Sequence, residues 1–191
     1  RLLKGIQESA TIETGQNLTI DLNGHTISSA GNAFINYGTL QICDTSVGKT
    51  GSIKQDNSIS DTAYAIENYG ELAIKDISFC GVQDNPNKAK LIHNAIENAV
   101  LAISSGYYDG DFDIVAGKAM ITGGSFSQNI HTQIAEGFAL VCKNGEFIID
   151  ALVNLNKQDK YWFDAETGVY HEYTGTEIPD KPDKPDKPTD P

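Results

Sequence analysis

The 191-residue chain carries 26 acidic and 14 basic residues, which gives a formal net charge of −12. Its one arginine is Arg1, so the chain lacks the clustered cations that bind nucleic-acid phosphates or anionic membranes. No apolar run approaches the roughly 20 residues of a membrane span. We therefore expect neither a nucleic-acid partner nor membrane insertion. Because the chain begins at Arg1 rather than Met, we also expect it to be a module of a longer protein. We expect this module to be monomeric.

A short apolar-x-apolar triplet recurs along most of the chain. Alternating apolar residues predict strands, and recurrence of one unit predicts stacked copies of that unit. The steps between copies vary from 18 to 32 residues, so the loops differ in length while the strands persist. The pattern predicts an all-β fold, a parallel solenoid over residues 1–150. The five copies are residues 18–20, 40–42, 72–74, 101–103 and 119–121.

The residues after the last triplet predict other structures. Two apolar segments around Asn144-Gly145 predict a hairpin that caps the end of the solenoid core. A second predicted hairpin lies in an extension of residues 151–178, which holds the one tryptophan. Residues 179–191 contain a Pro-Asp-Lys repeat without an apolar face. We expect this tail to be an extended, disordered spacer, because proline fixes φ and removes amide donors.

Asparagine precedes several of the triplets at a similar distance. Asn36 and Asn68 each begin an Asn-Tyr-Gly sequence, and Asn98 lies shortly before the next triplet. Stacked coils would place these side chains one above another at a corner of the solenoid. We expect their amides to bond to one another as an asparagine ladder, as in other stacked strands. Its predicted role is structural.

The repeats also resemble a known family. Residues 18–27 (LTIDLNGHTI) followed by 36–40 (NYGTL), with closing sequences near 123–126 and 135–145, are similar to the right-handed parallel β-helix (pectate-lyase-like) repeat regions of bacterial, Firmicutes-type cell-surface proteins. The resemblance implies a single-stranded right-handed parallel β-helix in an extracellular, cell-surface or cell-wall protein. The proline-rich tail resembles the spacers that lead toward a cell-wall anchor in such proteins. Lyases of this family typically rely on calcium-binding acidic residues together with Arg or Lys groups. Because Arg1 is terminal, an arginine that abstracts a sugar proton has no candidate within the repeats, and the family's catalytic residues cannot be assigned here.

Asp44 and Asp76 follow two of the triplets at the same distance, after Ile42 and Ile74. Stacking would bring their carboxylates close together, and like charges in contact shift a pKa or recruit a cation. Glycoside hydrolases use paired carboxylates of this kind. The two residues are therefore candidate catalytic groups. The alternative is that each bonds the backbone of its own turn.

Asp109, Asp111 and Asp113 alternate in a segment that predicts a loop. Calcium prefers such clusters of oxygen ligands, so the three residues are a candidate calcium site, and calcium is the one cofactor that we consider. The alternative is a solvated acidic loop.

Tyr37 and Tyr69 occupy equivalent places in neighbouring coils, each directly after a ladder asparagine. Aromatic rings in a row could bind sugars, so the two residues are candidate ligand-binding groups for a polysaccharide or host glycan. The alternative is that they brace the corner beside the ladder. A further prediction is that Tyr108 fills the core position that Phe79 and Phe126 occupy in their coils.

Three functions remain open. The first is a non-catalytic surface module for display, adhesion or glycan binding. The second is a polysaccharide lyase or glycoside hydrolase that uses Asp44 and Asp76. The third is a structural stalk without a ligand, since a fold alone does not establish a function.

Overall fold

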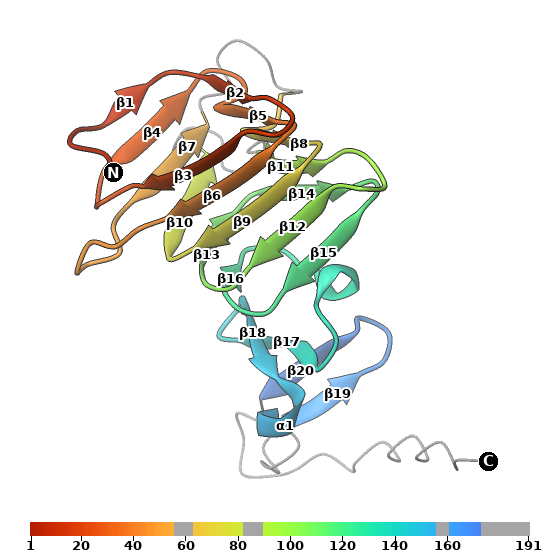
Figure 1. Ribbon diagram of the computed structural model, residues 1–191. Coiled ribbons are helices and arrows are strands. Elements are labelled where there is room, and N and C mark those ends of the chain that lie inside the picture. The colour runs from red at the N-terminus through yellow and green to blue at the C-terminus, as the bar shows by residue number, and fades with distance from the viewer. Residues whose placement is uncertain (56–62, 82–89, 156–160, 173–191) are drawn as a thin grey trace.

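The computed structural model describes residues 1–55, 63–81, 90–155 and 161–172. Its strands form three sheets, which Figure 1 shows as a stack of coils followed by hairpins toward the C-terminus. Within the stack, neighbouring strands of each sheet are three strands apart in the sequence, so each coil contributes one strand to every sheet. The fold is therefore the parallel β-helix that the repeats predict. The predicted spacer at 179–191 lies outside the described residues.

Sheet C contains all five predicted triplets. Leu18 is in register with Leu40, and Leu40 is in register with Leu72. Leu40 and Leu72 are at most 1% exposed, and burial of one such side chain stabilises a fold by about 1.5–3 kcal/mol. The sheet thus follows directly from the period-2 pattern. Its strands are β3 (Asn17–Asp21), β6 (Thr39–Cys43), β9 (Glu71–Lys75), β12 (Val100–Ile103) and β15 (Lys118–Ile121).

Sheet B precedes sheet C in each coil and is also parallel throughout. Its strands are short. In Ile66–Asn68 the side chains alternate, with Ile66 and Asn68 buried and Glu67 facing outward. The strands of sheet B are β2 (Ala10–Ile12), β5 (Phe34–Asn36), β8 (Ile66–Asn68), β11 (Lys90–Asn94) and β14 (Asp111–Ile114).

Sheet A begins as the third wall of the β-helix and then continues into the C-terminal hairpins. The wall strands pair in parallel, whereas the hairpin strands introduce antiparallel pairs. The strands in spatial order are β1 (Ile6–Gln7), β4 (Thr26–Ser29), β7 (Ser52–Gln55), β10 (Ile77–Gly81), β13 (Gly106–Asp109), β16 (Ser125–Phe126), β18 (Glu146–Ala151), β17 (Phe138–Lys143), β20 (Val169–Glu172) and β19 (Tyr161–Asp164).

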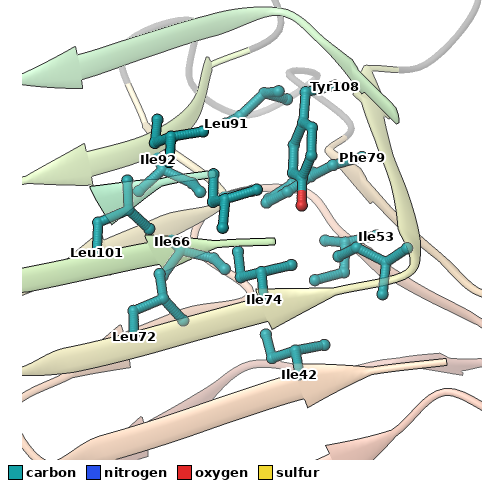
Figure 2. Close-up of a cluster of buried hydrophobic side chains, with 14 of the residues drawn as sticks. Ile42, Ile53, Ile66, Leu72, Ile74, Phe79, Leu91, Ile92, Leu101 and Tyr108 are labelled. Atoms are coloured by element: carbon teal, nitrogen blue, oxygen red, sulfur yellow. The ribbon is translucent and has the colours of Figure 1, made fainter. Parts of the chain in front are cut away.

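One apolar core lies between the three sheets. Figure 2 shows Ile66 of sheet B, Leu72 of sheet C and Phe79 of sheet A pointing into this space. All three are at most 1% exposed. Because each coil adds one layer of such side chains, the core is a continuous column along the β-helix.

Tyr108 occupies the core position that the sequence predicts for it. It is in register with Phe79 on one side and Phe126 on the other, and its ring stacks on that of Phe126 with centroids 5.0 Å apart. The side chain is fully buried, and its hydroxyl donates to the carbonyl oxygen of Ser105 at 2.9 Å. A tyrosine is tolerated here because this bond satisfies the buried hydroxyl.

The asparagine ladder forms, but its third member is Asn94. The Nδ2 of Asn36 donates to Oδ1 of Asn68 at 2.8 Å, and the Nδ2 of Asn68 donates to Oδ1 of Asn94 at 2.6 Å. All three side chains are fully buried, and each also donates to a backbone carbonyl of the following coil. The prediction of Asn98 as a ladder residue was wrong. Asn98 is exposed in the turn that follows.

The length of the turn between sheets B and C explains this correction. In two coils the turn has only two residues, 37–38 and 69–70. In the next coil the turn has five residues, 95–99, so the buried asparagine of that coil, Asn94, lies farther from its triplet. The short turns need glycine because successive coils approach closely there. A Cβ on Gly70 would lie 2.1 Å from the carbonyl oxygen of Gly38.

Two hairpins follow the β-helix. The first, β17–β18, turns at Asn144 and Gly145, which have φ values of 53° and 85°, as a two-residue type I′ turn requires. Its strand β18 pairs antiparallel with β16 and so covers the last coil, as predicted for a cap. The second, β19–β20, is joined to it through a parallel pair of β17 and β20.

The helical elements are short. A 3-10 turn, η2 (His131–Gln133), follows the last coil, and α1 (Leu152–Leu155) follows the first hairpin. Among the described residues, no helix has the length and apolar character needed to cross a membrane.

Candidate functional site

Asp44 and Asp76 occupy equivalent places in adjacent coils, because the residues before them, Cys43 and Lys75, are in register. Lys49 lies between the two. Its Nζ donates to the carbonyl oxygen of Asp44 at 2.6 Å and is 3.1 Å from Oδ2 of Asp76. The two residues thus occupy equivalent places, as the sequence predicts, and the Nζ of Lys49 connects the backbone of Asp44 to the carboxylate of Asp76.

The carboxylate of Asp44 is held entirely by its own turn and the coil before it. Oδ1 accepts the backbone N–H groups of Gly24 and Ser46, both at 2.9 Å. Oδ2 accepts the Ser46 hydroxyl at 2.8 Å and the N–H of Gly51. Burial raises the pKa of Asp44, but the hydrogen bonds from Ser46, Gly51 and Gly24 outweigh it, so the pKa is lowered. Asp44 is therefore an anion that organises the turn.

Asp76 is partly open to solvent and also ionised. The Ser105 hydroxyl donates to its Oδ1 at 2.7 Å and accepts its backbone N–H at 3.0 Å. The Ser105 hydrogen bond lowers the pKa of Asp76, and Lys49 lowers it further against the effect of burial. A glycosidase pair needs one carboxyl that keeps a proton, with a raised pKa. Lowered pKa values in both carboxyls favour the structural interpretation of this pair.

The three aspartates of the predicted calcium site are separated by a corner of the β-helix. Asp109 ends β13, Asp111 begins β14, and Gly110 turns the chain between them with φ of 149°. The prediction of one loop was therefore wrong. Asp111 accepts a hydrogen bond from the side chain of Gln128. Among the described residues, no three His, Cys, Asp or Glu side chains assemble as a metal-binding group.

Tyr37 and Tyr69 lie one above the other, as their equivalent positions predict. Their rings are stacked, with centroids 4.8 Å apart and an angle of 16° between the planes. Each ring therefore covers one face of the other, which leaves one face of each for other contacts. Tyr37 is 44% exposed. Burial raises the pKa of Tyr69, as do the charge of Glu67 and a hydrogen bond to it.

That contact joins the tyrosine pair to a row of outward side chains on sheet B. Register places Glu67 beside His93 and His93 beside Asp113, on three neighbouring strands. In the opposite direction the row continues through Ile35 to Thr11. We call this row and the side chains at its two edges the B face; its members are Thr11, Ile35, Glu67, His93 and Asp113, with Tyr64 and Lys90 at one edge and Tyr37 and Tyr69 at the other.

The polar groups around His93 form one connected cluster on the B face. Nδ1 of His93 is 3.0 Å from Oε2 of Glu67, and its Nε2 is 4.0 Å from Oδ2 of Asp113. The Tyr64 hydroxyl donates to Asp113 at 3.1 Å, and its ring lies 5.1 Å from that of His93. Nζ of Lys90 lies 5.2 Å from the centre of the Tyr64 ring, within range of a cation–π contact.

The carboxylates of this cluster alter the acidity of Tyr64. Burial raises its pKa to about 12, and the hydrogen bond to Asp113 and the nearby negative charges contribute. The phenol therefore remains protonated at neutral pH and acts as a donor. Glu67 and Asp113 act as acceptors, so the face offers both kinds of hydrogen-bonding group.

The sequence contains a local signal for this cluster. Ile66-Glu67-Asn68 and Ile92-His93-Asn94 share an Ile-x-Asn pattern, in which the middle residue must face outward when the other two are buried. Aligning the coils on the asparagine would have placed Glu67 beside His93. Alignment on the triplets of sheet C does not reveal this pair, because the longer turn 95–99 shifts sheet B relative to those triplets.

No protein-family model, curated protein or solved structure matches this chain. The geometry of the side chains therefore carries the functional argument.

Proposed function

We propose that the chain is a non-catalytic β-helix module of a bacterial cell-surface protein, and that it binds glycans through the B face. The observation that carries this proposal is the clustering of aromatic rings, hydrogen-bond donors and acceptors on one rigid sheet surface. Sugars are recognised by such a combination, because their rings have apolar faces and their hydroxyls both donate and accept. The cell-surface location rests on the resemblance of the repeats and of the proline-rich tail.

Rigidity favours recognition by this face. Glu67, His93 and Asp113 lie on strands whose backbones are paired on both sides or packed over the core, so their positions are set before a ligand arrives. Preorganised groups lose little conformational freedom on binding. The pairing of Asp113 with Tyr64 further restricts both side chains.

The test is a binding screen with the purified chain against immobilised neutral, amino-containing and uronate polysaccharides, with parallel measurement of new reducing ends. A double variant, Glu67→Gln with His93→Ala, should weaken the binding of any captured glycan at least tenfold, since each removes hydrogen bonds to a charged group worth about 1.5–3 kcal/mol. The matched control is Gln41→Ala with Ala73→Ser on sheet C, which should bind as the wild type does.

Three results would overturn the proposal. Absence of binding to every glycan would favour a stalk without a ligand. Equal binding by both double variants would place the site elsewhere. New reducing ends, abolished by Asp44→Asn or Asp76→Asn, would make the protein an enzyme.

A further inference from the structure

A pocket of about 500 Å³ lies on the first two coils, where sheets A and B meet. One wall is formed by residues 7–11, which run from the end of β1 into β2. The other wall is formed by residues 28–32 together with Ile35. The volume is in the range of small-molecule sites in proteins. The pocket is large enough to hold a sugar ring.

The lining of this pocket is polar and nearly uncharged. Its lining residues include Ser9, Thr11 and Ser28, and also Asn32, whose Nδ2 donates to the carbonyl oxygen of Tyr64 at 2.7 Å. Among the described residues that line it, Glu8 is the one ionisable side chain, and none is Lys, Arg or His. Such a lining offers hydrogen bonds to hydroxyl groups but no countercharge to a carboxylate, phosphate or sulfate. The chemistry therefore favours an uncharged, hydroxyl-rich ligand.

The pocket is continuous with the B face. Thr11 and Ile35 line the pocket and are also the first two members of the outward row that leads to Glu67 and beyond. Figure 1 shows β2 and β5 at the N-terminal end of this sheet, followed by β8, β11 and β14 along the stack. At a spacing of about 4.8 Å between strands, the three steps from Ile35 to Asp113 cover roughly 14 Å. One sugar ring cannot contact both ends of this distance.

We infer that the pocket binds the terminal unit of an uncharged oligosaccharide whose following units lie along the B face, parallel to the axis of the β-helix. This inference rests on the proposed function and adds to it the class, length and direction of the ligand. Glu67 and Asp113 reinforce the choice of class, because their negative charges would repel a uronate chain lying over them.

Gly31 provides a way to close the pocket without disturbing the fold. It lines the pocket, a Cβ there would meet no atom within 4 Å, and its backbone lies outside the left-handed region that strains other residues. Gly31→Tyr should therefore add a large side chain at the wall of the pocket and leave the melting temperature unchanged. The matched control is Val47→Tyr, which adds the same side chain at a fully exposed position in another turn.

The experiment titrates the wild type and both variants with cello-, xylo- and N-acetylchito-oligosaccharides of one to six units, and with oligogalacturonides as the anionic counterpart. We expect affinity for one neutral series to increase with length, and Gly31→Tyr to weaken binding at least tenfold while Val47→Tyr has no effect. Equal affinity of Gly31→Tyr and wild type, length-independent affinity, or preference for oligogalacturonides would overturn the inference and leave glycan binding by the B face intact. Absence of binding to every probe would overturn the proposed function itself.

Discussion

Sheets B and C are built alike and present different surfaces. Each has five parallel strands, one from each coil, and each turns a row of apolar side chains into the same core. The central outward row of sheet C, however, carries no charge and no aromatic ring, whereas that of sheet B carries two carboxylates and a histidine flanked by tyrosines. The outward row of sheet C is Thr19, Gln41, Ala73, Ala102 and Met120.

The difference separates the parts of a coil that form the fold from those that are free to vary. Inward positions are restricted to side chains that fill the apolar core, because a smaller side chain leaves a cavity and a polar one loses its hydrogen bonds to water; both lower the stability of the fold. Outward positions contribute little to the core, so functional groups can be present there without loss of stability. The contrast is open to test by substitutions at neighbouring inward and outward positions.

The largest effect is expected from an inward residue of sheet C. Leu40→Ala should lower the free energy of unfolding by about 2–5 kcal/mol, because it leaves a cavity in a fully buried layer. Its neighbour Gln41 is exposed, and Gln41→Ala should change stability by less than about 0.5 kcal/mol. Urea unfolding of both variants measures the difference. Similar losses for the two would contradict the division between inward and outward positions.

The ladder tests the same division for a buried polar side chain. Asn68→Ala should cost roughly 3 kcal/mol, because it removes bonds to Asn36, to Asn94 and to a backbone carbonyl, and leaves buried groups without partners. Asn98→Ala, in the exposed turn, should cost less than about 0.5 kcal/mol. A larger loss for Asn98 than for Asn68 in urea unfolding would show that the ladder is assigned to the wrong asparagine.

Acid should weaken the turns between sheets C and A. The pKa values of Asp44 and Asp76 are lowered in the folded state, so their stabilising effect is present above the unfolded pKa, near 4, and is lost as the pH falls through the folded pKa below it. At pH 7, Asp44→Asn should reduce stability by roughly 2 kcal/mol. Thermal unfolding between pH 7 and 2.5 should show the wild type and this variant converging at low pH. A constant difference would contradict the assignment.

The smallest effect on stability is expected on the B face. Glu67→Gln preserves the shape of a side chain that is 19% exposed and removes its charge. The free energy of unfolding should therefore change by less than about 1 kcal/mol. The affinity of Glu67→Gln for glycans should nevertheless fall. In Gln41→Ala, both the stability and the glycan affinity should stay at their wild-type values. Paired melting and binding measurements on the two variants make the comparison. A loss of stability in Glu67→Gln as large as in Leu40→Ala would mean that the B face belongs to the structural framework.

Most of the β-helix could be predicted from the sequence, because its signals are local. The five triplets of sheet C, the inward Tyr108 and the Asn-Gly turn of the cap each depend on a few consecutive residues whose conformation follows from backbone sterics and burial. Asp44 and Asp76 were placed in adjacent coils for the same reason, since each follows its triplet at the same short distance.

The candidate site could not be predicted in the same way. The contact of Glu67 with His93 joins residues 26 positions apart, and it depends on how many residues each intervening loop and turn contains. The misplaced Asn98 has the same origin, because one longer turn shifts sheet B relative to sheet C. Likewise, the corner at Gly110 separates aspartates that are close in sequence.

The local sequence is enough to identify the residues that face the core, because the alternation of inward and outward side chains is a property of a single strand. Contacts between outward side chains of different coils depend on the folded chain, because the register between coils is set by the length and path of every connection around the β-helix. Tyr64 illustrates the point: it precedes its strand by two residues, yet its hydroxyl reaches Asp113, 49 residues away and two coils farther along the stack.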